Sequence, residues 1–308
     1  MSPATPAQAE MEALIGMMDE TDTEIYPLLK NALFQIGEGA VPYLENARLK
    51  KDSPLWQSRM ESLLRELLLD IACRKLSDWK EEKCPDLLQG FFYLSSAFYP
   101  DLSWEEARNT FNRMHGDCGL LLASAERLKE RVAIFSNFFF NECKFKFGSR
   151  IASGYQFADF LLPNLIHLKQ GNDRSLALAY QYLAERNRIP VFLLNLPVVN
   201  LLACTADMEK REKKDLRFCI DISRYGSTID RDALEPMLSI QKQIQLCNTV
   251  EALQDHVKLL HFMVDRLEDD PFRKEAMKKL YTCMDCQDTN GPNLSATDFS
   301  NPENGNLY

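Results

Sequence analysis

One segment near the middle of the chain combines a strong helix signal with a strand signal that follows at once. Residues 171–186 read GNDRSLALAYQYLAER, in which a glycine and two short polar residues precede a run of helix-favouring residues. Residues 189–197 read IPVFLLNLP, a short apolar run between prolines. This order predicts a helix followed closely by a buried strand, so the central part of the chain combines helix and sheet.

The composition bounds the size and the class of the protein. With 308 residues, 45% of them hydrophobic, the chain can form more than one sizeable core. Its 36 basic and 45 acidic residues give a net charge of -9, and no block rich in lysine or arginine overrides that balance. Because such a surface repels polyanions on average, we expect no nucleic acid partner.

The cysteines and the N-terminus bear on the compartment. The nine cysteines are odd in number and scattered, and most lie in apolar segments, so we expect reduced thiols. The first ten residues lack the basic flank and the apolar run of a secretory signal. The apolar stretch over 189–206 is broken by Pro190 and Pro197, which argues against a membrane span. Together these features predict a cytoplasmic protein without a membrane partner.

Helical periodicity dominates on both sides of the central segment. Apolar residues recur at helical spacing over 11–80 and again over 231–281. Residues 33–44 place glycines where a first helix ends and Pro42 in the first turn of the next. This hairpin is similar to one HEAT-type repeat, although an ordinary helical bundle explains it equally well. The C-terminal helices resemble tetratricopeptide-like hairpins.

Several helix limits can be placed from local signals. Ser53 stands before a proline and Ser103 stands three residues before a glutamate, and both patterns are typical of helix starts. We also expect one long helix over about 120–142 and another over about 159–169, because apolar residues recur there without an obvious break.

Short fragments in a fixed order carry a family resemblance. They are YPDL at 99–102, residues 138–148, FLLPNL at 160–165, GN at 171–172, SLALAY at 175–180, IPV at 189–191, NLP at 195–197 and IDISRYG at 220–226. Through the order and spacing of these fragments, residues 99–238 resemble the SirB family of transglutaminase-like proteins, in the helical-repeat form found in bacteria. The resemblance implies a papain-related domain with a small antiparallel sheet packed on its central helix.

The resemblance also implies where catalytic residues would lie. In the wider fold a cysteine in the first turn of the central helix is the nucleophile, because the helix N-terminus favours its thiolate. A histidine on the adjacent strand takes the proton, and an aspartate on the next strand orients that histidine. Asp173, Val199 and Asp221 stand at these three positions. A carboxylate is a poor nucleophile towards an amide and valine exchanges no proton, so the positions are vestigial and no catalytic residue is expected.

Ordinary structural roles account for the same residues. Aspartate is among the best helix N-caps, which explains Asp173, and Asp221 can form the turn that follows its strand. Relocated catalytic groups are the alternative, and the nearest ones are Cys204, Cys219, Ser175 and His167. Buried structural thiols and a surface imidazole account for the same residues without a coincidence, so we favour the structural interpretation.

Metal and cofactor signals are weak. Cys283 and Cys286 have a spacing suited to zinc or to redox exchange, but no second pair follows them, and the chain has only four histidines. Gly37 and Gly39 lack the remaining residues of a phosphate-binding loop. We expect no metal and no cofactor.

The sequence therefore predicts a mainly helical α+β chain. Its parts are an N-terminal helical, HEAT-like region over 1–98, a SirB-type transglutaminase-like domain over 99–230, C-terminal tetratricopeptide-like hairpins over 231–284 and a disordered tail over 285–308. For function, we expect a non-catalytic cytoplasmic interaction or scaffold protein with a protein or peptide partner. One alternative is a ligand- or peptide-binding module that uses a relic cleft near Asp173, Asn200 and Asp221. The other is a hydrolase or transferase with relocated catalytic residues.

Overall fold

The computed structural model describes residues 6–17, 25–50, 53–148, 156–194, 201–209, 212–240 and 245–286. Its α-helices are α1 (Pro6–Met17), α2 (Ile25–Ile36), α3 (Val41–Lys50), α4 (Pro54–Lys80), α5 (Leu87–Ser96), α6 (Trp104–Leu122), α7 (Leu128–Asn137), α8 (Leu162–His167), α9 (Asp173–Arg186), α10 (Arg231–Ile240), α11 (Thr249–Leu267) and α12 (Pro271–Cys283). Its strands are β1 (Lys146–Phe147), β2 (Gln170–Gly171), β3 (Val191–Leu193), β4 (Leu201–Cys204), β5 (Phe218–Asp221) and β6 (Ser227–Asp230). Helices dominate and the strands form two small sheets, which confirms the mainly helical α+β class.

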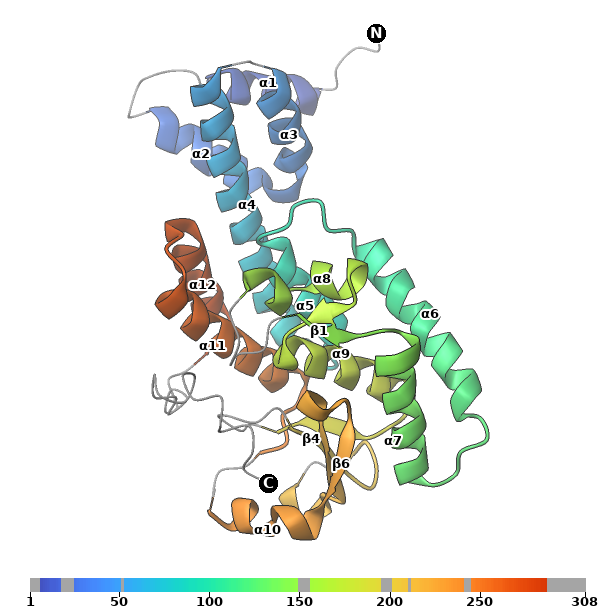
Figure 1. The fold of residues 1–308 in the computed structure, drawn as a ribbon. Coiled ribbons are helices and arrows are strands. Elements are labelled where there is room, and N and C mark those ends of the chain that lie inside the picture. The colour runs from blue at the N-terminus through green and yellow to red at the C-terminus, as the bar shows by residue number, and fades with distance from the viewer. Residues whose placement is uncertain are drawn as a thin grey trace.

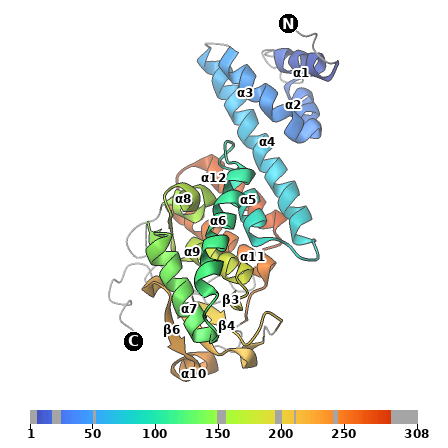
Figure 2. The ribbon, with the colours of Figure 1, turned by 90° about the vertical axis from the view of Figure 1, so that its right-hand side faces the viewer.

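Helices α1 to α3 pack around the first half of the long helix α4, which runs on into the rest of the molecule (Figures 1 and 2). Leu33, Leu44 and Met60 form the centre of this core, and each is fully buried. Gly37 closes α2 with a φ of 68°, a conformation that glycine adopts at little cost. Ser53 caps α4, because its Oγ accepts a hydrogen bond from the Trp56 N–H. The helix limits predicted at these two positions are confirmed.

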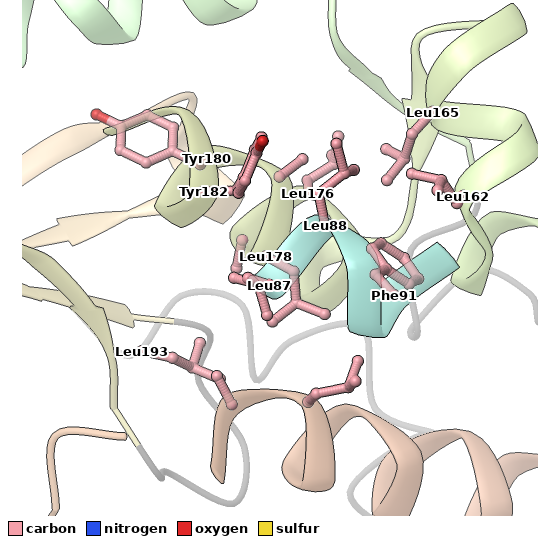
Figure 3. Close-up of a cluster of buried hydrophobic side chains, with 14 of the residues drawn as sticks. Leu87, Leu88, Phe91, Leu162, Leu165, Leu176, Leu178, Tyr180, Tyr182 and Leu193 are labelled. Atoms are coloured by element: carbon pink, nitrogen blue, oxygen red, sulfur yellow. The ribbon is translucent and has the colours of Figure 1, made fainter. Parts of the chain in front are cut away.

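The second half of α4 joins the main hydrophobic core, in which α9 is central. Figure 3 shows Leu176 and Leu178 of α9 converging with side chains of the neighbouring helices. Among the side chains labelled there are Leu87, Leu88 and Phe91 of α5 and Leu162 and Leu165 of α8. Leu176 and Leu165 are fully buried, so α9 is surrounded rather than exposed along one face. The core thereby fixes the position of the first turn of α9.

A four-stranded antiparallel sheet lies beside α9, in the order β3-β4-β5-β6. Because side chains alternate along a strand, every second residue faces each side. On one side Leu202 and Phe218 join the main core with α9. On the other side Ala203 and Cys219 pack with Leu234 of α10. The sheet is therefore covered on one face by α9 and on the other by α10 (Figure 1).

The prediction of one long helix over 120–142 is wrong. The chain forms α6 up to Leu122 and starts α7 at Leu128, and one turn of π-helix over Phe138–Glu142 follows α7. Leu120 is 80% exposed, so it does not belong to the apolar stripe from which continuity was inferred. Residues 123–127 contain neither glycine nor proline, so the sequence gives no local signal for the break.

The helix predicted over 159–169 is also shorter than expected. A 3-10 turn, η3 (Phe157–Phe160), comes first, and α8 begins only at Leu162. Pro163 lies in the first turn of α8, where its missing N–H is tolerated. The helix ends at His167, and Lys169 adopts a positive φ of 52°. From residue 287 on, the predicted tail lies outside the described residues.

Candidate functional site

Helix α9 begins directly after β2 and is capped by Asn172. The Asn172 Oδ1 accepts a hydrogen bond from the Ser175 N–H at 2.7 Å, and the Asn172 N–H donates to the Asp159 carbonyl at 3.0 Å. Gly171 lets the strand approach closely, because a Cβ at this position would lie 2.4 Å from the Ser175 Oγ. The start of the central helix is thus fixed from both sides.

Asp173, at the position of the expected nucleophile, is the first residue of α9 and not its cap. The predicted role of Asp173 as N-cap is therefore wrong, because Asn172 takes that role. The carboxylate of Asp173 lies in the first turn, where the partial positive charge of the helix N-terminus favours an acid. Residue 173 therefore places a negative charge at the N-terminus of α9, where a thiol nucleophile would be expected.

Ser175, one of the alternative nucleophiles, is engaged with the backbone. Its hydroxyl is fully buried and lies 2.6 Å from the Asp159 carbonyl and 3.2 Å from the Asn172 carbonyl. The Asp159 carboxylate is buried as well, and its Oδ1 accepts hydrogen bonds from Asn164 Nδ2 and Gln170 Nε2, each at 3.0 Å. These groups form a polar network that joins η3, α8, β2 and α9, and the network occupies the Ser175 hydroxyl.

A buried ion pair links the first turn of α9 to α11. Arg174 NH1 lies 2.7 Å from Asp255 Oδ2, and the side chains are 6% and 20% exposed. Charges removed from water are stable only when they are paired, so each of these two residues depends on the other. The pair therefore anchors the C-terminal helices to the region where a catalytic centre would lie.

His256 follows Asp255 on α11 and is completely buried. Its Nε2 lies 2.8 Å from the Phe160 carbonyl, and the edge of the Phe91 ring packs against the imidazole. Burial lowers the pKa of His256 to about 4, with a smaller lowering by the charge of Arg174, while the hydrogen bond to Phe160 opposes both. The imidazole is neutral at pH 7. Because a carbonyl only accepts, Nε2 carries the proton and Nδ1 is an acceptor.

Several polar atoms around this first turn are buried without a hydrogen-bond partner in the described part of the chain. They are Asn172 Nδ2, Arg174 Nε and His256 Nδ1. Two of them donate and one accepts, so a polar molecule such as water could bridge them. The start of α9 is thus a polar centre inside an otherwise apolar core.

Of the other two positions that the resemblance implies, Val199 lies outside the described residues and Asp221 ends β5. The Asp221 Oδ1 accepts a hydrogen bond from Ser223 Oγ at 2.6 Å, and its Oδ2 lies 3.6 Å from Arg224 Nε. Its carbonyl accepts from the Gly226 N–H at 2.9 Å, which closes a turn. Asp221 therefore has the local partners of a turn-forming residue.

The turn after β5 lies beside the strand that precedes α9. Tyr225, in this turn, contacts the ring of Phe147, with 5.4 Å between the ring centroids. Phe147 is in turn paired with Gly171, the residue before the α9 cap. The fold thus brings the end of β5 and the start of α9 into one region, as the resemblance implies, although only Asp173 and Asp221 of the three positions are described.

The other alternative catalytic residues, Cys204, Cys219 and His167, do not form a thiol–imidazole pair. Cys204 and Cys219 are fully buried on opposite faces of the sheet, and burial raises the pKa of each thiol to about 12. His167 is half-exposed, with its Nδ1 3.5 Å from Glu106 Oε1. All nine cysteines and all four histidines lie in the described ranges, and no cysteine sulfur is within hydrogen-bonding distance of an imidazole.

Metal and membrane signals are also missing from the described ranges. Within those ranges, no three histidine, cysteine or acidic side chains converge in a way that could hold a metal ion. Every helix there is too short or too polar to cross a bilayer.

Sequence reasoning overlooked Asp159, Arg174, Asp255 and His256. One signal was available for His256, because it lies among Leu253, Val257 and Leu260 on the apolar stripe of its helix. A polar residue in that stripe has to find a buried partner. The partner itself could not be predicted, since Phe160 precedes His256 by 96 residues.

The comparison with known families agrees with this geometry. A protein-family model described as the transglutaminase-like superfamily matches residues 105–260, about half of the chain. The match includes α9 and the whole four-stranded sheet, and it extends into α11 as far as Asp255 and His256. The chain therefore belongs to the transglutaminase-like superfamily. No curated protein and no solved structure matches the chain significantly.

Proposed function

We propose that this protein is a non-catalytic member of the superfamily, related to the SirB type, that acts in the cytoplasm by binding a protein or peptide. One observation carries the proposal: among the cysteines and histidines, all of which lie in the described ranges, no sulfur is hydrogen-bonded to an imidazole. Thiol-dependent acyl transfer requires such a pair, because the base has to remove the thiol proton.

The electrostatics of the buried groups supports the same conclusion. Burial raises the pKa of the Cys118, Cys204 and Cys219 thiols to about 12, far from the range in which a thiolate forms at pH 7. Burial lowers the pKa of His256 to about 4, so this imidazole is a weak base. Both kinds of group have pKa values shifted away from those that catalysis at neutral pH needs.

A groove next to the N-terminal helices supports a binding role. It has a volume of about 290 Å³ and lies between α3 and α4 on one side and the α5–α6 connection and the start of α12 on the other. Arg48, Arg65 and Tyr99 line it, together with Phe157 and Phe272. Arginine and aromatic side chains are the usual anchors of protein interfaces. We propose this groove as the contact region for the partner.

An activity assay tests the non-catalytic role. Hydrolysis and transamidation are measured with the purified chain over a broad panel of peptides and amine donors. We expect no turnover above the buffer rate, and no difference between the wild type and Asp173→Ala. Turnover that Asp173→Ala or Cys204→Ser abolishes would refute the proposal.

Affinity capture tests the binding role. The intact chain is used as bait, and the captured proteins are identified by mass spectrometry. We expect Arg48→Glu combined with Tyr99→Ala to reduce the partner at least tenfold. Leu120→Ala is the matched control, because Leu120 is exposed on α6 and far from the groove in the sequence. Equal capture by both variants would exclude the groove.

One observation favours a second function, a small-molecule-binding module at the start of α9. Asn172 Nδ2, Arg174 Nε and His256 Nδ1 are buried polar atoms without a hydrogen-bond partner in the described residues, and a bound polar molecule would satisfy such atoms. Native mass spectrometry of the purified protein would detect a retained ligand, and Asn172→Ala should release it. If the protein retains only water, this second function is excluded.

A further inference from the structure

A cavity of about 520 Å³ lies between α2, α4 and α12, away from the start of α9. It brings together parts of the chain that are distant in sequence, since α4 belongs to the N-terminal half and α12 is the last described helix. Phe34, Leu69 and Lys279 contribute to its wall, and so do Cys73 of α4 and Cys283 of α12. We call it the α4/α12 cavity.

Two thiols meet in this cavity. Cys73 and Cys283 are half-buried, both line this cavity, and each thiol shifts the pKa of the other. Cys283 is the last residue of α12, where its Sγ lies 3.3 Å from the Leu280 carbonyl and its own carbonyl accepts from Lys80 Nζ at 2.9 Å. α4 and α12 pack against each other, so both helices hold the two sulfurs together.

We propose that Cys73 and Cys283 form an oxidant-responsive dithiol, which becomes a disulfide when the protein meets a peroxide. The Cys73 thiolate attacks one oxygen of hydrogen peroxide, the O–O bond breaks and hydroxide leaves, which produces a sulfenic acid on Cys73. The Cys283 sulfur then attacks the Cys73 sulfur, the S–O bond breaks, and the hydroxyl group leaves as water with the proton of Cys283. Two electrons pass from the two sulfurs to the peroxide.

The hydrogen bond of Cys283 to the backbone assigns the order of these steps. The Cys283 thiol donates to the Leu280 carbonyl at 3.3 Å, which holds the proton on Cys283, so the thiolate forms on Cys73 first. The interaction with Cys283 also lowers the pKa of Cys73, while burial and the charge of Asp70 oppose this and the charge of Lys279 adds a smaller lowering. The same contact, together with burial, raises the pKa of Cys283, which keeps its proton until the second step. One sulfur is thus the reactive one and the other resolves the sulfenic acid.

Other cysteines are less suited to this pairing. Cys286 shares the two-residue spacing with Cys283, but it is buried, its Sγ points at the Gln254 carbonyl at 3.7 Å, and burial raises its pKa to about 12. Cys84 is exposed but has no thiol partner in the described residues. The α4/α12 cavity is therefore the site where an intramolecular disulfide forms with the smallest movement.

A disulfide between α4 and α12 would change the whole molecule. It would close a loop of about 210 residues, which contains the entire transglutaminase-like domain. Cross-links that close long loops restrict the unfolded chain the most, so the oxidised protein should unfold at a temperature higher by roughly 5 °C. Oxidation would also fix α12 against the N-terminal helices.

Peptide mapping of the full-length wild-type protein tests the proposal. The protein is treated with a small excess of hydrogen peroxide, free thiols are alkylated, and a non-reducing digest is analysed by mass spectrometry. We expect the Cys73–Cys283 linked peptide to rise at least tenfold, and a reductant to reverse it together with the rise in unfolding temperature. Cys73→Ser should abolish both effects, whereas Cys286→Ser and Cys84→Ser should keep both.

Any of three results would overturn the proposal. They are a Cys283–Cys286 bridge as the main product, dimers linked through Cys84, and free thiols after treatment that oxidises an unrelated dithiol control. The wild-type map is decisive by itself, so the test holds even if Cys73→Ser fails to fold. A negative result here leaves the non-catalytic function unaffected, because that function does not involve Cys73 or Cys283.

Discussion

The start of α9 and the α4/α12 cavity both gather side chains that can perform chemistry, but their surroundings are opposite. At the start of α9, His256 is completely buried, and burial lowers its pKa to about 4. In the cavity, Cys73 is half-buried, and its contact with Cys283 lowers its pKa despite partial burial. Both pKa values fall, yet one group loses its function as a base and the other gains reactivity as a nucleophile.

This difference shows that burial and a neighbouring partner have separate effects on the pKa of a side chain. Dry surroundings keep the imidazole at the start of α9 neutral and weakly basic, so the polar groups there hold helices together. Cys73 is only half-buried and lines the α4/α12 cavity beside a second thiol, so its sulfur can be reached by a small oxidant. Under the two proposals made above, solvent access and the nearest partner decide which groups react, rather than position within the superfamily domain.

Removal of the buried charge at the start of α9 should have the largest effect. Asp255→Asn would leave the Arg174 guanidinium buried beside a neutral amide, and we expect a loss of about 4 kcal/mol in the free energy of unfolding. Chemical denaturation would measure it. The matched control is Asp230→Asn, whose pair with Lys129 has side chains 68% and 59% exposed, and it should cost no more than about 0.5 kcal/mol. Equal losses in the free energy of unfolding would show that the Arg174–Asp255 pair at the start of α9 is exposed to water.

Acid should destabilise the protein through His256. Its pKa is about 4 when folded and 6.5 when unfolded, so the unfolded chain binds the proton first. The stabilisation is complete above pH 6.5 and is lost as the pH falls towards 4. Between pH 7 and 4.5 we expect His256 to contribute a loss of about 2.5 kcal/mol, measured by denaturant unfolding. His256→Gln should remove this part of the pH dependence.

The control for the acid effect is the half-exposed imidazole of His167. His167→Gln is the comparison variant, because the His167 side chain is 50% exposed whereas His256 is completely buried. If His256→Gln and His167→Gln change the slope equally, the buried imidazole is not the source of acid sensitivity.

Crowding at the α9 start should give the next largest effect. In Gly171→Ala the new Cβ would lie 2.4 Å from Ser175 Oγ and 2.9 Å from a methyl group of Leu165, and we expect a loss of about 2 kcal/mol. Gly116→Ala is the matched change in α6, where a Cβ meets nothing within 4 Å, and it should stabilise by about 0.5 kcal/mol. Thermal or chemical unfolding of both variants would decide, and a similar sign for the two would contradict the close packing.

The sequence predicted part of the polar centre at the start of α9. The glycine and the polar residues at 171–173 predict a helix start, and the structure begins α9 at Asp173. The cap predicted at Asp173 is formed by Asn172 instead, and the sequence could not have decided between them, because both residue types cap helices well. The ion pair of Arg174 with Asp255 joins residues far apart in the chain, so it could not be predicted from local sequence patterns.

The α4/α12 cavity shows the same limit. From the sequence, the two-residue spacing of Cys283 and Cys286 has little weight, because no second pair follows, and it gives no sign of a partner elsewhere in the chain. The structure instead places Cys73, from another helix, against Cys283. Helical periodicity identified α4 and α12, but their packing against each other depends on the folding of everything between them.

The smallest predicted effect separates capping from charge at the vestigial nucleophile position. Asn172→Ala removes the acceptor for the Ser175 N–H and should cost about 1 kcal/mol. Asp173→Asn keeps the size of the side chain and removes only a charge near the helix N-terminus, so it should cost about 0.5 kcal/mol, and less at high salt. Denaturant unfolding at low and high ionic strength would measure both variants. A larger loss for Asp173→Asn that salt does not reduce would mean that this carboxylate has a role beyond the helix start, and the view of position 173 as vestigial would fail.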